Sequence, residues 1–307
     1  MTLPRRTFVR LAASAVAAPA ISRFAWAATD PSQPVRILVG FAPGSSADMI
    51  ARVVGRSLSE RTGQEFIVDN RPGIGGNLAT EAVVNAAADG HTLLMSGTSD
   101  AINATLYEKL TFNFRRDIAP VAALLRSPNV VLVSALVPVE TVDDLVALAK
   151  ADPGKLRMAS AGVGSASHLA GEMFKMATGA EMEHVAYRGG GADTYADLIA
   201  GRADVYFPAR ASAIDHIRDG RLRALAVAGY EASTWFGIGA PRGTPANIVA
   251  RLNRQINAVL ADAEIASWIA GFGGTVTAGS PADLGTLIAE ETERWAKVIK
   301  ASGTTLS

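Results

Sequence analysis

Val35-Arg36-Ile37-Leu38-Val39-Gly40-Phe41-Ala42-Pro43-Gly44-Ser45-Ser46-Ala47-Asp48 is an apolar run of strand length that breaks into a loop rich in glycine and serine. An amphipathic pattern follows to about Glu60, with apolar residues spaced to share one face of a helix: Met49, Ile50, Val53, Val54 and Leu58. A buried strand that passes through a short loop into such a helix is the first half of a βαβ unit. The stretch therefore predicts an α/β fold with mostly parallel sheets.

The alternation of strand and helix patterns occurs in two sets, over 35–96 and over 142–227. A strand at 235–238 and three helical stretches then follow. This order predicts a chain that builds one lobe, crosses to a second and returns to the first. We expect a first lobe made of 28–128 with 233–307, and a second lobe made of 129–232.

The first 27 residues have the pattern of an export signal. A charged segment, Pro4 to Arg10, precedes an apolar stretch, Leu11 to Ile21, and the motif Ala25-Trp26-Ala27 follows. The pair Arg5-Arg6 is typical of a twin-arginine signal, with the general secretory route as the alternative. The apolar stretch of about 11 residues is shorter than the ~20 that cross a bilayer. We therefore expect cleavage near Ala27, a periplasmic protein and no membrane insertion of the mature chain.

The charge balance and the cysteine count exclude several classes of protein. The chain has 29 basic and 29 acidic residues, and the export signal holds four of the arginines and no acid. The mature net charge is then about −4, which argues against a nucleic-acid partner. Without cysteine there is no disulfide, no thiolate nucleophile and no cysteine metal site. We expect a monomer that needs no cofactor.

The loop after the first strand is a candidate anion site. The first N–H groups of a helix have no partner within it, and the helix dipole adds positive charge there. The candidate contacts are Phe41, Pro43, Gly44, Ser45, Ser46 and Asp48. The alternative is local capping, because Ser45 and Asp48 form an S-x-x-D box that satisfies the same donors.

A second loop of this kind, at 159–168, again runs from a strand through glycine and serine into a helix. Ligands of open α/β sheets bind at the carboxyl ends of the strands, so two facing loops would clamp a carboxylate with backbone N–H groups. The candidate contacts are Ala161, Gly164, Ser165, Ser167 and His168. For His168, contact with the ligand and a hydrogen bond to the backbone are both open.

The sequence contains only incomplete forms of the motifs that mark nucleotide-binding, catalytic and metal sites. Gly162-Val163-Gly164 is half of a dinucleotide-binding motif, because Ser167 stands where the third glycine belongs, and no Walker lysine or G-x-S-x-G is found. The four histidines show no metal-ligand spacing: His91, His168, His184 and His216. The glycine run 71–77 follows a strand and precedes a helix, so it is either a third anion-facing loop or a tight turn, and we favour the turn. These absences favour a binding protein over an enzyme.

Six segments, in a fixed order, carry a family resemblance: Pro34 to Gly44, Asp69 to Asn77, Ala88 to Leu94, Ala159 to Glu172, His184 to Gly189 and Gly220 to Val227. Together they resemble the periplasmic receptors of tripartite tricarboxylate transporters, the Bug-type binding proteins. The resemblance implies a two-lobe Venus-flytrap fold, similar to the type II fold of periplasmic binding proteins. It also implies a receptor that delivers a dicarboxylate, tricarboxylate or aromatic acid to membrane transporter subunits. It also implies a third contact segment at 97–100, with Thr98 and Ser99 as candidate contacts.

Two positions depart from the family pattern. Family members carry a longer segment where Ala228 meets Gly229 here. We expect its loss either to shorten a hinge between the lobes or to disturb the packing of the lobes. At Pro208-Ala209-Arg210, we hypothesise that Arg210 projects into the cleft and pairs with a second ligand carboxylate. The alternative is a solvated arginine at a helix start.

For the whole chain, a ligand-sensing subunit and an α/β enzyme acting on a small acid are the alternatives to a transport receptor.

Overall fold

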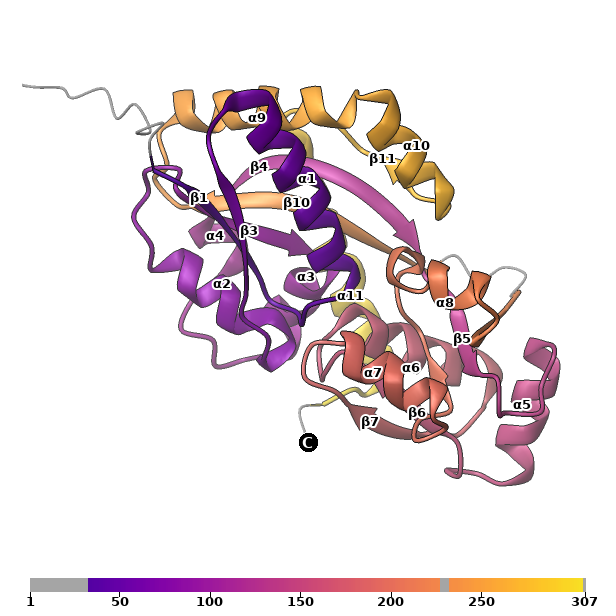
Figure 1. Cartoon of the computed structure of the whole chain (residues 1–307). Helices are drawn as coiled ribbons and strands as arrows, with labels where there is room; N and C mark the ends of the chain where they lie inside the picture. The colour runs from indigo at the N-terminus through magenta and orange to yellow at the C-terminus, as the bar shows by residue number, and fades with distance from the viewer. Residues whose placement is uncertain (1–32, 227–231, 306–307) are drawn as a thin grey trace, which may run out of the picture.

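The computed structural model describes residues 33–226 and 232–305, which form two α/β units (Figure 1). The expected export signal and the Ala228–Gly229 connection lie outside these residues. The strands form a six-stranded sheet in the order β11-β4-β10-β3-β1-β2 and a five-stranded sheet in the order β7-β6-β8-β5-β9. We call the part of the chain around the six-stranded sheet the first lobe and the part around the five-stranded sheet the second lobe.

The first sheet combines parallel and antiparallel strands. Strand β1 (Val35–Val39) lies between β2 (Phe66–Asn70) and β3 (Thr92–Gly97) and is parallel to both. Strand β10 (Ser233–Pro241) is antiparallel to β3 and to β4 (Ile118–Pro128), and the short β11, at 275–276, is antiparallel to β4. The sheet is thus mixed rather than mostly parallel, because the chain returns from the second lobe in the opposite direction.

Helices cover both faces of the first sheet. One face carries α1 (Ser46–Thr62), α9 (Ala246–Leu260) and α10 (Ala263–Gly271), and the other carries α2 (Asn77–Val84), α3 (Thr98–Leu106), α4 (Phe114–Asp117) and α11 (Pro281–Ser302). On α1 the buried residues Ile50, Val54 and Leu58 recur every four positions, so one face of the helix packs on the sheet. No helix within 33–226 and 232–305 has the length and apolar character needed to cross a bilayer.

The second lobe repeats this layered arrangement on a smaller scale. Its strands are β5 (Val131–Ser134), β6 (Arg157–Ser160), β7 (Glu183–Ala186), β8 (Val205–Tyr206) and β9 (Leu222–Leu225). Strands β7, β6 and β8 are parallel, whereas β5 is antiparallel to both β8 and β9, so this sheet is mixed as well. One face is covered by α5 (Val142–Ala151) and α6 (Ala166–Thr178), and the other by α7 (Ala192–Ile199) and α8 (Ile214–Arg218).

Asn129 lies where the chain crosses from β4 in the first lobe to β5 in the second. Its backbone N–H donates to the carbonyl of Ala232, at 2.9 Å, just before β10 begins. Its side-chain amide donates to the carbonyl of Phe207 at 2.9 Å, and its side-chain oxygen accepts from the hydroxyl of Thr234 at 3.0 Å. One buried asparagine therefore ties together the outgoing strand, the returning strand and the second lobe.

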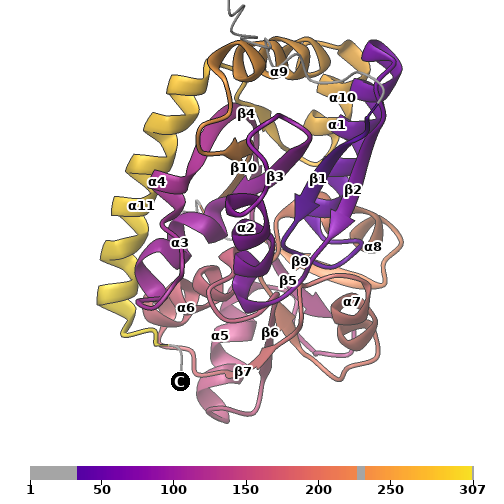
Figure 2. The same ribbon diagram turned by 90° about the vertical axis from the view of Figure 1, so that its left-hand side faces the viewer.

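The two lobes are in direct contact with each other. The N–H of Ala42 in the first lobe donates to the carbonyl of Gly189 in the second, at 3.1 Å. The hydroxyl of Tyr107 donates to the carbonyl of Val163, at 3.0 Å. Figure 2 shows α11 of the first lobe running down one side of the molecule to α6 of the second, and these two helices are in contact.

Candidate functional site

The start of α1 presents unpaired backbone N–H groups. Ser45 is the N-cap, and its hydroxyl accepts from the N–H of Asp48 at 3.3 Å. One carboxylate oxygen of Asp48 accepts from the N–H of Gly44 at 2.9 Å, and the other is 2.8 Å from the guanidinium of Arg52. Among the described residues, the N–H groups of Ser46 and of the following Ala47 have no acceptor. Local capping by Ser45 and Asp48, one of the two alternatives predicted for this loop, therefore occurs. It still leaves the backbone N–H groups of Ser46 and Ala47 available to a ligand.

The start of α6 has the same local geometry in the second lobe. Ser165 is the N-cap with φ −73° and ψ 156°, against −72° and 160° at Ser45, and Gly164 shares the φ of +80° found at Gly44. The hydroxyl of Ser165 accepts from the N–H of His168 at 3.3 Å. In the described part of the chain the N–H of Ser167 has no acceptor. The two lobes thus carry matching helix starts.

A third helix start, that of α3, lies beside these two. Its N-cap is Gly97, whose N–H donates to the carboxylate of Asp100 at 2.8 Å. The second carboxylate oxygen of Asp100 accepts from the hydroxyl of Thr80 at 2.8 Å, and burial raises the pKa of Asp100 to about 6. The hydroxyl of Ser99 accepts from the N–H of Ala166 at 3.1 Å, so a bond between α3 and α6 joins the lobes at this point.

The three helix starts border a hollow between the lobes. Eight of the predicted contacts line it: Phe41, Ser45, Ser46, Thr98, Ser99, Ala161, Ser165 and Ser167. No side chain among the described lining residues is acidic, basic or a histidine. Its polar side chains are hydroxyls of serine, threonine and tyrosine, so an anion in this hollow would be held by neutral donors.

Four predicted contacts shape the loops and do not line the hollow: Pro43, Gly44, Asp48 and Gly164. The carbonyl of Pro43 accepts from the N–H of Ala192 in the second lobe at 3.3 Å. At Gly164 an added Cβ would lie 2.3 Å from Oδ1 of Asn103 in the first lobe. These positions therefore matter for the approach of the lobes.

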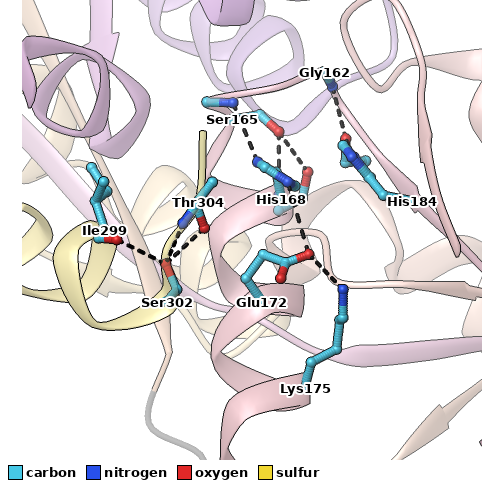
Figure 3. Close-up of polar contacts among 12 residues, drawn as sticks. Gly162, Ser165, His168, Glu172, Lys175, His184, Ile299, Ser302 and Thr304 are labelled. Carbon is cyan, nitrogen blue, oxygen red and sulfur yellow. Dashed lines mark hydrogen bonds and ion pairs between the residues drawn. The ribbon is translucent and has the colours of Figure 1, made fainter. Parts of the chain in front are cut away.

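His168 lies behind the second loop (Figure 3). Its Nδ1 accepts from the N–H of Gly164 at 3.4 Å, and its ring stacks on that of His184 with centroids 4.1 Å apart. His184 is in turn hydrogen-bonded to Ser160 at 2.7 Å. Burial lowers the pKa of His168 to about 3, so its ring is neutral at pH 7. Two roles were predicted as alternatives for His168, contact with the ligand and a hydrogen bond to the backbone. In the structure His168 makes the hydrogen bond to the backbone and does not line the hollow.

Arg210 does not line the hollow, contrary to the hypothesis that it projects into the cleft. It begins a single 3₁₀ turn, Arg210–Ser212, and is only partly buried. Its guanidinium faces the turn at Gly273 of the first lobe, where an added Cβ would lie 3.6 Å from Nη1. Pro208 and Ala209 before this turn and Ser212 at its end line the hollow, whereas Arg210 does not.

Gly97 and Ala166 also line the hollow and lie within the predicted contact segments, although neither was singled out as a contact. The remaining lining residues were not predicted: Ala47, Met95, Ser96, Gly189, Gly190, Tyr206, Pro208, Ala209, Ser212, Thr234 and Phe236. Tyr206 is the last residue of strand β8 in the second sheet. Because ligands bind at the carboxyl ends of such strands, this position could have been used to predict it as a contact. Ser212 accepts from the hydroxyl of Ser46 at 2.8 Å and lies 2.5 Å from that of Tyr195. This chain of hydroxyls crosses from one lobe to the other, which no local pattern reveals.

Comparison with known proteins was consistent with this geometry. The model of the tripartite tricarboxylate transporter family receptor matches residues 50–234 and 227–304. Protein BugT of Bordetella pertussis is 33% identical over 318 residues, covering 96% of each chain. The structure of Rpa4515 of R. palustris with adipate has 33% identity and a TM-score of 0.85, over 89% of this chain and 98% of that one. MatC of Rhodopseudomonas palustris with bound malate has 27% identity and a TM-score of 0.82, over 88% and 99%.

Proposed function

The chain belongs to the receptor family of tripartite tricarboxylate transporters, and we propose that it closes its lobes on a small carboxylate and delivers it to membrane transporter subunits. Its family and its structural neighbours are periplasmic solute-binding receptors and not enzymes, and this chain is such a receptor. We further propose export with cleavage near Ala27, and a mature monomer.

The observation that carries the proposal is the convergence of three helix starts on one hollow without a charged side chain. Free N–H groups at a helix start bind anions because they point at the ligand and because the dipole adds positive charge. Ser46 and Ala47 offer such groups from the first lobe, and Ser167 offers one from the second. A carboxylate, with two acceptor oxygens, suits donors that come from two sides.

Closure couples this recognition to a change of shape. A ligand can favour the closed state only through contacts that the open state lacks, and donors divided between two lobes meet that condition. We propose that 28–128 with 233–307 move as one body and 129–232 as the other. The bond from Ala166 to Ser99, between the helix starts of the two lobes, would form in this movement.

The test is a thermal-shift screen of carboxylates on the chain from residue 28, followed by calorimetry and small-angle X-ray scattering. We expect at least one carboxylate to raise the melting temperature by several degrees, to be recovered unchanged and to reduce the radius of gyration. A broad panel without any stabilising carboxylate would refute the proposal.

A variant pair examines the role of the lobe contact. Ser99→Ala removes the acceptor for the N–H of Ala166, so we expect severalfold weaker binding of the ligand found in the screen. Ser57→Ala changes a serine of α1 that does not line the hollow and serves as the control. Equal affinity in the two variants would contradict a role for Ser99 in closure.

A further inference from the structure

Two stacked histidines hold the second loop from behind (Figure 3). His168 lies in α6 and His184 in β7, and their rings stack with centroids 4.1 Å apart and 18° between the ring planes. Nδ1 of His168 accepts from the N–H of Gly164 at 3.4 Å. Nε2 of His184 is 2.7 Å from the hydroxyl of Ser160, whose oxygen accepts from the N–H of Gly162 at 3.1 Å. Each ring thus holds one N–H group of the loop, directly or through one hydroxyl.

The backbone of this loop has little conformational preference of its own. Gly162 and Gly164 have φ of +110° and +80°, a region that glycine enters readily. Their N–H groups are bonded on the side of the histidines, whereas the carbonyl of Val163 between them accepts from the hydroxyl of Tyr107 in the first lobe at 3.0 Å. The contact of this loop with the first lobe therefore depends on what fixes the two glycines.

Both rings must offer an unprotonated nitrogen for these bonds. Ser160 is buried and its oxygen already accepts from Gly162, so its single hydrogen is the one that Nε2 of His184 can accept. Burial lowers the pKa of His184 from its ordinary value and that of His168 to about 3. Both rings are then neutral at pH 7, and each keeps one nitrogen as an acceptor.

The residues that follow the loop supply the second lobe's side of the hollow. Ser165 and Ser167 line it, and the N–H of Ala166 donates to the hydroxyl of Ser99 in the first lobe at 3.1 Å. His184 lies in β7 and does not line the hollow. It can therefore influence a ligand in the hollow only through the loop.

We propose that His184 is a positioning residue of the candidate site. Its ring nitrogen holds Ser160, which fixes the N–H of Gly162, and its ring face supports His168, which holds Gly164. This inference rests on the proposed function, because the loop is placed for contact with a carboxylate and with the first lobe. Serine also forms such a turn alone, by accepting from the N–H two residues on. An independent turn of this kind would leave the site unchanged when His184 is replaced.

Hydrogen exchange by NMR and calorimetry, both on the chain from residue 28, test this role. His184→Phe keeps a ring for the stack and removes the acceptor, and Ser160→Ala removes the hydroxyl. We expect each variant to exchange the amide of Gly162 faster. We also expect each to bind adipate or malate, the acids bound in two structural neighbours, severalfold more weakly than the unmodified chain.

The double variant separates action through Ser160 from an independent effect. Since both changes break one chain of hydrogen bonds, His184→Phe with Ser160→Ala should bind no more weakly than the weaker of the two single variants. The control is His91→Phe, the same substitution just before β3 in the first lobe, which should change neither exchange at Gly162 nor affinity.

Unchanged exchange of Gly162 in His184→Phe would overturn the inference, and so would losses of affinity that add in the double variant. A lower melting temperature with unchanged exchange and affinity would show a purely structural role and overturn it as well. If neither acid binds the unmodified chain, the exchange rates alone decide on His184, whereas the thermal-shift screen decides on the proposed function.

Discussion

The backbone N–H of Ser46 can be removed by substitution, which gives a direct test of the binding mode. Proline has no N–H and is favoured at the first position of a helix, which Ser46 occupies in α1. The residue before a proline must be extended, and Ser45 already is, with ψ 160°. Ser46→Pro should therefore fold normally while it deletes one of the donors that we assign to the ligand.

The matched variant is Ser46→Ala. The hydroxyl of Ser46 donates to Ser212 at 2.8 Å and lies 3.2 Å from the carbonyl of Ala209, and both substitutions lose these contacts. The two variants then differ in the N–H and in the two ring carbons, Cγ and Cδ, that proline adds. A hydrogen bond to a charged group contributes about 1.5–3 kcal/mol, which corresponds to roughly 10- to 150-fold in affinity.

Calorimetry with the ligand found in the screen measures the difference. We expect Ser46→Pro to bind at least about tenfold more weakly than Ser46→Ala. The carboxamide analogue of the ligand detects a steric effect of the ring, since it has the same shape but no charge. Equal affinities for the carboxylate, or equal losses for the carboxylate and the carboxamide, would refute the assigned hydrogen bond.

Two other substitutions probe the second lobe. Gly164→Ala places a Cβ 2.3 Å from Oδ1 of Asn103, so we expect the closed state to be lost and affinity to fall about tenfold or more. Gly154→Ala is the control, since it has a similar φ of +81° but open space around it, and equal affinities in calorimetry would contradict the collision. His168→Asn tests the buried histidine by urea denaturation at pH 7 and pH 4.5. The pKa of His168 is lowered from 6.5 to about 3, so the unfolded chain binds more protons between these values. The free energy of unfolding should therefore fall with decreasing pH, by up to about 1.4 kcal/mol per pH unit, and less so in the variant. An equal fall in both proteins would argue against a neutral buried ring.

The two matching loops could be predicted from the sequence because their signals are local. A strand, a glycine at positive φ, a serine cap and a helix occupy neighbouring positions at 39–48 and at 160–168, so short-range chemistry is sufficient to predict them. The capping role of Ser45 followed from its S-x-x-D box with Asp48, whereas the matching role of Ser165 was not predicted. The family resemblance added Thr98 and Ser99, which do line the hollow.

The antiparallel strands and the hydroxyl network were not predicted, because they depend on contacts distant in sequence. Strand β10 lies between β3 and β4 only because the chain has first completed the second lobe. Thr234 and Phe236 reach the hollow through this insertion, and Ser212 reaches it through its bond to Ser46. The place of Arg210 was also not predicted, since its guanidinium lies beside Gly273, a neighbour distant in sequence.

In the mechanism that we propose, the division of donors between the lobes would let a neutral site bind an anion and still release it. With the lobes apart, the first lobe keeps Ser46 and Ala47, whereas Ser167 and its helix dipole move away with the second lobe. An anion in an open cleft stays hydrated and is largely screened from these partial charges. Closure removes the water, and only then do the dipoles of α1 and α6 act together on one carboxylate. No formal cation would have to be separated from the ligand when the lobes reopen, which suits the proposed delivery to membrane transporter subunits.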